Sequence, residues 1–358
     1  MNLLLFIAGL AALVLGANLL VRGASRLALS FGISPLVVGL TVVAFGTSAP
    51  EVAVSVGAAL QGQTDIAVGN VVGSNVFNVL FILGLSALIV PLVVNVQLIR
   101  QEVPIMIGAS LLLLVLMQDG RVGLFDGALL LALLFVYTAY LVVQSRAETQ
   151  SARDTFAEEL PGPAPGAWDA SMPVQVALVV AGLALLVMGS EWLVTAAVAF
   201  ARSLGVSDLV IALTIVAAGT SMPEVATSIV AALKGERDMA VGNIVGSNTF
   251  NILGCIGLSG LAAGPAGLGV APQVMAFDIW VMVATAMACL PIFISGREIA
   301  RWEGGLFLAY YAAYAAWLIL SAMHSGVLPA YASVMMSFVL PLTLVTLVVM
   351  IVHRPPRK

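Results

Sequence analysis

Two glutamates lie inside otherwise apolar stretches, each preceded by hydroxyl side chains at helical spacing. Glu51 follows Thr47 by four residues and Ser48 by three, so the three side chains share one face of a helix. The same Gly-Thr-Ser-x-Pro-Glu order recurs at Thr220, Ser221 and Glu224. The proline before each glutamate is expected in the middle of a helix. There it removes a backbone donor, and we expect it to free carbonyl oxygens near Ala44 and Ala217.

A second motif, Gly-Asn-x-x-Gly-Ser-Asn-x-Phe-Asn, follows each glutamate. Its serine and last asparagine are four residues apart and share a helix face, at Ser74 with Asn78 and at Ser247 with Asn251. Both motifs together offer two carboxylates and a ring of neutral hydroxyl, amide and carbonyl oxygens. Hard cations such as Ca²⁺ and Na⁺ prefer such ligands. The motifs therefore predict an all-oxygen cation site near the middle of the membrane.

The charge of this site indicates what it could exchange. Neither motif contains a Lys or Arg that could neutralise Glu51 or Glu224. A bare carboxylate is costly in a bilayer, so each must be protonated or paired with a cation. Two negative charges balance one Ca²⁺, two Na⁺ or two H⁺, and exchange among these is antiport. A histidine relay is not expected, because His324 and His353 fall outside the apolar runs.

Simpler interpretations of these residues stay open. Intramembrane Asn and Ser often only join neighbouring helices, and the motif glycines could simply permit close packing. Glu191 aligns with Asn18 and is expected to be peripheral or structural. Glu102, Asp278 and Glu303 lie near the ends of apolar runs and are expected at the interface, although Glu102 and Asp278 occupy comparable places in two halves of the chain.

The composition indicates which kind of secondary structure carries these residues. The chain has 358 residues, of which 61% are hydrophobic and 9% charged, with a net charge of −4. Such a chain is an all-α polytopic membrane protein, and the absence of a basic patch argues against nucleic-acid binding. Cys255 and Cys289 lie in apolar runs and are expected to be small buried hydrophobes. The first run lacks a basic leader and is expected to be a retained span.

Eleven spans are predicted. Their approximate ranges are 2–21, 33–60, 66–91, 98–117, 123–143, 173–197, 206–233, 239–263, 272–294, 302–322 and 329–352. With the N-terminus outside, 12 of the 14 Lys and Arg residues fall on one side. The positive-inside rule then predicts a multi-pass protein of the plasma (inner) membrane with a cytoplasmic C-terminus.

The two motif pairs belong to an internal repeat. Residues 39–80 match residues 212–253 without a gap, at a constant offset of 173. Five spans separate equivalent positions, so the second copy enters the membrane from the opposite side, as in alternating-access transporters. We expect a first repeat at 1–143, a cytoplasmic linker at 144–172, a second repeat at 173–322, and an extra span with a basic tail at 323–358.

The doubled motifs resemble the repeats of the calcium/cation antiporter superfamily, most nearly its prokaryotic sodium/calcium exchanger branch. The resemblance implies ion ligands from the second and third helices of each half, with spans 1 and 6 sliding to switch access. Carried over to this chain, the ligands are Thr47, Ser48, Glu51, Ser74, Asn78, Thr220, Ser221, Glu224, Ser247, Asn251 and the backbone oxygens of Ala44 and Ala217. Members of that branch often carry Asp where this chain has Asn251, which leaves the coupling ion open between Na⁺ and H⁺.

The functional expectation is a Na⁺/Ca²⁺ antiporter that exports Ca²⁺, with Ca²⁺/H⁺ exchange as the alternative. A passive channel is disfavoured by the inverted repeat, and a membrane scaffold leaves the paired glutamates unexplained. No nucleophile, base and orienting group recur together, so enzymatic catalysis is not expected. The expected partners are Ca²⁺, Na⁺ and the lipid bilayer; no cofactor is expected, and we take the chain as a monomer.

Overall fold

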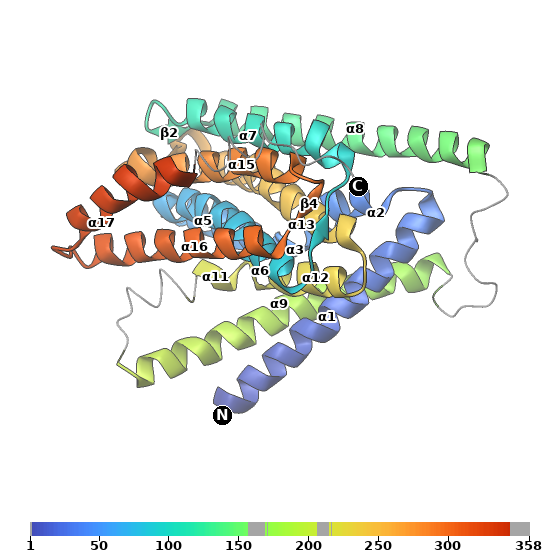
Figure 1. Cartoon of the computed structure of the whole chain (residues 1–358), viewed down its shortest axis with the longest axis horizontal. Coiled ribbons are helices and arrows are strands. Elements are labelled where there is room, and N and C mark those ends of the chain that lie inside the picture. Colours follow the sequence, from blue (N-terminus) through green and yellow to red (C-terminus); the bar gives the residue numbers. More distant parts are fainter. Residues whose placement is uncertain (1, 157–168, 170, 206–214, 216, 344–358) are drawn as a thin grey trace.

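The computed structural model describes residues 2–156, 169, 171–205, 215 and 217–343. The molecule is a bundle of apolar helices (Figure 1), of which eight in the described part are long and apolar enough to cross a membrane. They span Leu3–Phe31, Thr64–Ile89, Leu98–Leu116, Leu124–Ser145, Met172–Ser203, Arg237–Ala262, Val274–Ile294 and Arg301–Ala322. A ninth candidate span is broken, because Pro35–Thr47 and Ala49–Leu60 meet at 46°.

These helices are composed of shorter segments, several of them π-helical. In the first half they are α1 (Asn2–Phe31), α2 (Pro35–Val38), η1 (Gly39–Val43), α3 (Ala44–Thr47), α4 (Ala49–Leu60), α5 (Thr64–Phe77), η2 (Asn78–Leu83), α6 (Gly84–Ile89), η3 (Leu98–Glu102), α7 (Val103–Leu116) and α8 (Leu124–Phe156). In the second half they are α9 (Met172–Ser203), α11 (Ala217–Gly219), α12 (Met222–Leu233), α13 (Arg237–Phe250), η5 (Asn251–Ile256), α14 (Gly257–Ala262), η6 (Gly264–Ala266), η7 (Val274–Asp278), α15 (Ile279–Ile294), α16 (Arg301–Ala322), α17 (Leu328–Val334) and η8 (Met335–Val339).

The predicted spans agree with these helices, with differences at their ends. We expected the first span to end at 21, but α1 continues to Phe31. Arg22 and Arg26, one turn apart in this extension, both contact Asp169, so their charges are paired there. Likewise α8 runs past 143 to Phe156, so the expected linker begins inside a helix. Parts of the seventh and eleventh predicted spans, at 206–214, 216 and 344–352, lie outside the described residues.

The two halves are related by an inverted repeat, which the pairing of short strands makes visible. Strand β1 (Leu92–Val93) pairs with β4 (Glu298–Ile299), and β2 (Arg121–Val122) pairs with β3 (Leu268–Gly269). Each pair joins one half to the other, and β1 and β3 hold equivalent places in the two halves. Such reciprocal pairing is what two-fold symmetry requires. The predicted fold class, two inverted halves of apolar helices, is confirmed.

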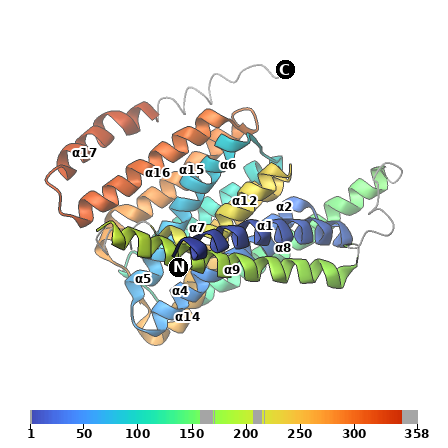
Figure 2. The same ribbon diagram turned by 90° about the horizontal axis from the view of Figure 1, so that it is seen from below.

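Helices α1 and α9 lie side by side and cross the outside of the bundle (Figure 2). Glycines permit this close contact: a Cβ added at Gly9 would lie 2.9 Å from the Gly189 carbonyl oxygen, and one at Gly16 would lie 2.8 Å from that of Gly182. Gly182 and Gly189 are the repeat equivalents of Gly9 and Gly16. The crossing therefore obeys the same two-fold symmetry as the strands.

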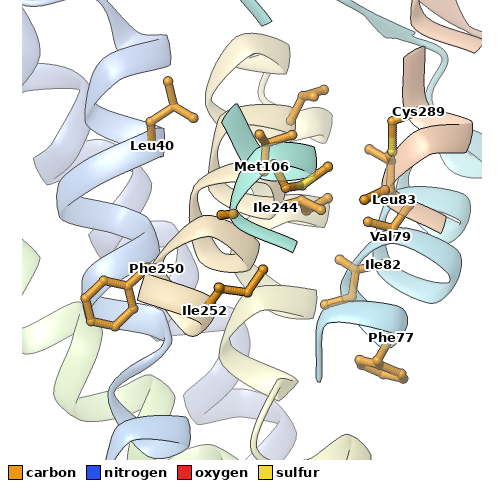
Figure 3. Close-up of a cluster of buried hydrophobic side chains, with 14 of the residues drawn as sticks. Leu40, Phe77, Val79, Ile82, Leu83, Met106, Ile244, Phe250, Ile252 and Cys289 are labelled. Carbon is orange, nitrogen blue, oxygen red and sulfur yellow. The ribbon is translucent and has the colours of Figure 1, made fainter. Parts of the chain in front are cut away.

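The remaining helices bury a continuous apolar core, part of which is drawn in Figure 3. Both cysteines are buried there, as expected for small hydrophobes. Beyond the repeats, α17 packs against α16, where the Tyr331 hydroxyl donates to the Ala313 carbonyl oxygen at 2.8 Å. This C-terminal segment lies at the edge of the bundle (Figure 2).

Candidate functional site: a polar cluster between the two halves

Both glutamates lie at a break in a helix. Helix α3 ends at Thr47, Ser48 has a ψ of 8°, and α4 begins at Ala49. The proline of the motif therefore lies in the first turn of a new helix, where its missing N–H costs nothing, rather than in mid-helix as we predicted. Glu51 is in the first turn of α4, where the positive end of the helix dipole favours a carboxylate. The second half repeats this arrangement around Ser221.

The carbonyl of Ala44 is not freed by the proline, which corrects our physical argument for it. It accepts the Ser48 backbone N–H at 3.1 Å and the Thr47 hydroxyl at 3.4 Å. The equivalent Ala217 begins α11, and its side chain lies outside the described set. A carbonyl oxygen has two lone pairs and can bind a cation while it accepts a hydrogen bond. The role of the Ala44 and Ala217 carbonyls as ligands therefore stays a prediction.

The glutamates of the two halves are held by each other's serines. Ser48 donates to Glu224 Oε1 at 3.0 Å, and Ser221 donates to Glu51 Oε1 at 2.7 Å. All four side chains are 0% exposed. The breaks in the two helices thus face one another, and each carboxylate lies beside the opposite half of the molecule.

Several oxygen atoms at this point have no hydrogen-bond partner among the described residues. Each glutamate uses Oε1 and leaves Oε2 unpaired. The other unpartnered oxygens of the two motifs are Ser74 Oγ, Ser247 Oγ, Asn78 Oδ1 and Thr220 Oγ1. Of these, the Ser74 and Thr220 hydroxyls lie close to the Glu51 carboxylate. Buried polar atoms are normally paired, so a cluster of unpaired oxygens from both halves is suited to a cation.

Four asparagines from α5, η2, α13 and η5 form an amide network beside the glutamates. Asn75 and Asn248 exchange hydrogen bonds from side chain to main chain, each at 3.2 Å. Asn78 donates to Asn248 Oδ1 at 3.0 Å, and Asn251 donates to Asn75 Oδ1 at 3.1 Å. These bonds are again reciprocal, and they fix the direction of the Asn78 and Asn251 side chains. Asn75 and Asn248 belong to the second motif but are not among the predicted ligands.

A second set of polar residues outside the predicted ligand set flanks the cluster. Asn70 donates to Ser55 Oγ at 3.0 Å, and its equivalent Asn243 donates to Ser228 Oγ at 2.9 Å. Asn243 also accepts the Thr47 hydroxyl at 3.2 Å. Ser55 lies one helical turn beyond Glu51 on the same face, which is the sequence signal that could have found it.

The carboxyl groups near the ends of the spans lie apart from the cluster, and two of them are buried against tyrosines. Glu102 is 0% exposed and accepts Tyr137 OH at 2.7 Å and Gln97 Nε2 at 2.9 Å. Asp278, its counterpart, is 7% exposed and accepts Tyr314 OH at 3.0 Å. The sequence shows that each group lies near a helix end but not which tyrosine covers it, and their position at the membrane interface stays a prediction.

Glu303 and Glu191 differ from that pair. Glu303 is 2% exposed and accepts the backbone N–H of Ala300 at 2.7 Å, so it is buried as a helix cap. Glu191 is exposed on α9. Neither joins the central cluster.

These features define a class: a helical multi-pass membrane protein made of two inverted halves with a buried polar cluster between them. The family described as "Sodium/calcium exchanger protein" matches residues 1–143 and 174–320. The chain therefore belongs to the sodium/calcium exchanger protein family, which confirms the resemblance in the motifs.

Individual relatives agree with this assignment. The chain is 39% identical to the putative antiporter CaxA of Alkalimonas amylolytica over 86% of this chain and 95% of that protein. It is 32% identical to the sodium/calcium exchanger MaX1 of Methanosarcina acetivorans, over 87% of this chain and 97% of the relative. A solved structure of the sodium-calcium exchanger NCX_Mj, soaked with 2.5 mM Na⁺ and 0.1 mM Ca²⁺, superimposes with a TM-score of 0.73, at 31% identity, over 88% of this chain and 97% of that one.

Proposed function

We propose that this chain, a cation/calcium antiporter by family and fold, exports Ca²⁺ from the cytoplasm in exchange for Na⁺. The observation that carries the proposal is the meeting of Glu51 and Glu224 at 0% exposure, each with one unpaired carboxylate oxygen. A dehydrated Ca²⁺ placed between them would neutralise both charges and take up the oxygens that lack partners. The names of the relatives MaX1 and NCX_Mj support Ca²⁺ and Na⁺ as the exchanged ions.

The proposed ligands are those derived from the two motifs. They are the carboxylates of Glu51 and Glu224, the hydroxyls of Thr47, Ser48, Ser74, Thr220, Ser221 and Ser247, the amide oxygens of Asn78 and Asn251, and the carbonyls of Ala44 and Ala217. Because the same carboxylates would bind Ca²⁺ and Na⁺, the two ions compete. Competition makes the exchange obligatory, since the site is charged and costly to bury without a cation.

Alternating access follows from the symmetry of the fold. The two halves hold the site at their interface, and α1 with α9 forms an outer pair joined by glycine contacts. Small residues at that crossing let the two backbones approach closely, so α1 and α9 can move as one unit. We propose that movement of this pair across the bundle opens the site to one side of the membrane and then the other.

The orientation proposed is N-terminus outside and C-terminus cytoplasmic. The contact of Asp169 with Arg22 and Arg26 supports it, because it puts the end of the linker and the end of α1 on one side. That side carries most of the basic residues, as the positive-inside rule requires of the cytoplasm.

The test is ⁴⁵Ca²⁺ uptake into proteoliposomes loaded with Na⁺, compared with vesicles that carry an outward proton gradient alone. Uptake should follow the Na⁺ gradient and be abolished in Glu51→Gln and in Glu224→Gln, while Glu191→Gln, at an exposed position, transports normally. Uptake driven by protons alone would move the chain to Ca²⁺/H⁺ exchange. Absence of any gradient-driven uptake would refute the calcium assignment.

A further inference from the structure

We infer that Ser190 is a positioning residue that favours one of the two access states of the exchanger. The inference rests on the proposed function, because it concerns the movement of α1 and α9 that would open the site to either side. It is carried by one hydrogen bond between the outer helix α9 and the helix break of the second half, and by the alanine at the equivalent position of the first half.

The bond occupies a carbonyl oxygen that the motif proline leaves without its helical donor. In a continuous helix the Gly219 carbonyl would accept the N–H of residue 223, but that residue is a proline and has none. The Ser190 hydroxyl donates to this carbonyl at 2.6 Å, and Ser190 is 5% exposed. Serines inside helices commonly bond to their own helix, whereas this one bonds to a neighbouring element. The bond ties α9 to a residue two positions before Ser221, the serine that donates to Glu51.

One face of α9 covers the breaks of both halves, and α11 lies beside it (Figure 1). Leu183, Ser190 and Val194 are seven and four residues apart and share this face. A Cβ added at Gly219 would collide with the Val194 side chain, and one added at Gly46 would lie 2.6 Å from Leu183 Cδ2. Glycine at both breaks therefore lets α9 approach them this closely.

Helix α1 does not cover the breaks in the same way. At the repeat offset of 173, Leu183 corresponds to Leu10 and Ser190 to Ala17. Leu10 is 50% exposed, whereas its equivalent Leu183 lies against Gly46. The two outer helices are thus symmetric with each other but displaced relative to the two breaks. A shift of the pair along the membrane normal has this effect, and it is the movement proposed for the change of access.

The alanine makes the two access states unequal. In an inverted repeat the opposite state arises when the two halves exchange their arrangements. The Gly46 carbonyl, which also lacks its helical donor because residue 50 is a proline, would then meet Ala17, which has no polar hydrogen to donate. A buried carbonyl without a partner is costly, so the bond from Ser190 stabilises the state that contains it over its opposite. A bond made in only one state shifts the equilibrium between the two.

The experiment compares the half-saturating Ca²⁺ concentration at the two faces of the membrane, measured as Na⁺-driven ⁴⁵Ca²⁺ uptake into right-side-out and inside-out membrane vesicles. The apparent affinity at each face scales with the fraction of protein open to that face, so the ratio of the two values reports the equilibrium between access states. Ser190→Ala removes the bond and should change this ratio roughly fivefold. Ser110→Ala in α7 is the matched control with an expected wild-type ratio, since this buried serine donates to the Met106 carbonyl of its own helix.

The reciprocal variant Ala17→Ser tests the same inference by adding a bond instead of removing one. It supplies the donor that the opposite state lacks, so the ratio should change in the same direction as in Ser190→Ala. The double variant should show roughly the product of the two changes. General damage to folding would lower the amount of active protein at both faces and leave the ratio unchanged.

An unchanged ratio in either folded single variant, or changes in opposite directions, overturns the inference while leaving Na⁺/Ca²⁺ exchange intact. If one single variant is not recovered folded, the other decides alone. Loss of all Na⁺- and H⁺-driven uptake by the wild-type protein refutes the proposed function and the inference together.

Discussion

At the scale of the residue, the site depends on oxygens that the fold leaves unpaired. Ser48 and Ser221 each hold one oxygen of the opposite glutamate, and the second oxygen has no partner among the described residues. This division is the same in both halves. In the proposed site the serines would position the carboxylates before an ion arrives, which lowers the cost of ordering them on binding.

We predict that Ser48→Ala and Ser221→Ala weaken Ca²⁺ binding to a similar extent. Each removes one hydrogen bond to a buried carboxylate, worth about 1 kcal/mol or somewhat more, which is roughly a fivefold change in affinity. The measurement is ⁴⁵Ca²⁺ binding to purified protein in detergent. Ser86→Ala and Ser259→Ala are matched controls, because these serines are also buried repeat equivalents but make no described bond to either glutamate. An effect of equal size in the controls would show that the loss is not specific to the site.

At the scale of the element, two structural features position the cluster: the breaks in two helices and the close contact of α1 and α9 at glycines. The helix break at Ser48 brings Glu51 to the start of α4, and the reciprocal break at Ser221 does the same for Glu224. Around them, α1 and α9 approach through Gly9, Gly16, Gly182 and Gly189. An added methyl group at this crossing meets backbone, which cannot move aside as a flexible side chain can.

Gly16→Ala and Gly182→Ala are expected to destabilise the protein by about 1 to 3 kcal/mol each. Each new Cβ would lie within 2.8 Å or less of backbone on the opposite helix. The readout is the thermal unfolding temperature in detergent. Gly305→Ala in α16 is the control, since nothing lies within 4 Å of its added Cβ. Equal stability of all three variants would contradict the packing described for α1 and α9.

Asp169 provides a second element-scale prediction, because it joins the end of α1 to the start of α9. Hydrogen bonding from Arg22 holds the pKa of Asp169 below its ordinary value of 3.8. A lowered pKa means that the contact is fully present above pH 3.8 and is lost as the pH falls through the lower folded-state value. Hydrogen exchange of the last turns of α1, corrected for intrinsic rates, should be the same at pH 5 and pH 7 and faster in Asp169→Asn. A loss of protection at pH 5 would refute this assignment.

The sequence predicted much of this arrangement and missed what depends on tertiary contacts. The motif spacing indicated Glu51 and Glu224, and the constant repeat offset indicated their symmetry. The sequence could not show which serine bonds to which glutamate, because Ser48 and Glu224 are 176 positions apart in the chain. Similarly, the sequence does not reveal that Tyr137 covers Glu102, because the two residues lie on different helices.

At the scale of the whole molecule, the two inverted halves form the site and the C-terminal segment lies beside them. The family match ends at residue 320, before α17 begins. Contacts of the segment from α17 to Thr343 with α16 include the bond from Tyr331 and a hydrogen bond between Tyr310 and Thr343. This segment is therefore an addition to the edge of a complete repeat pair.

We predict that a chain ending at Met323 retains Na⁺-driven Ca²⁺ uptake within about twofold of the full chain, because the site and both halves are intact. Removal of α17 exposes one face of α16 to lipid, which costs little for an apolar face. Uptake is normalised to the amount of folded protein recovered in the vesicles. Complete loss of uptake by folded, truncated protein would give the C-terminal segment a role in transport.

The most direct test of the central claim, that one Ca²⁺ is shared by the glutamates of both halves, is equilibrium ⁴⁵Ca²⁺ binding to wild-type protein, Glu51→Gln and Glu224→Gln. The account predicts that high-affinity binding in the wild type is displaced by Na⁺, and that either single variant loses it while the unfolding temperature is maintained. Retention of binding in one variant, or partial retention in both, would show two separate sites and contradict the shared site.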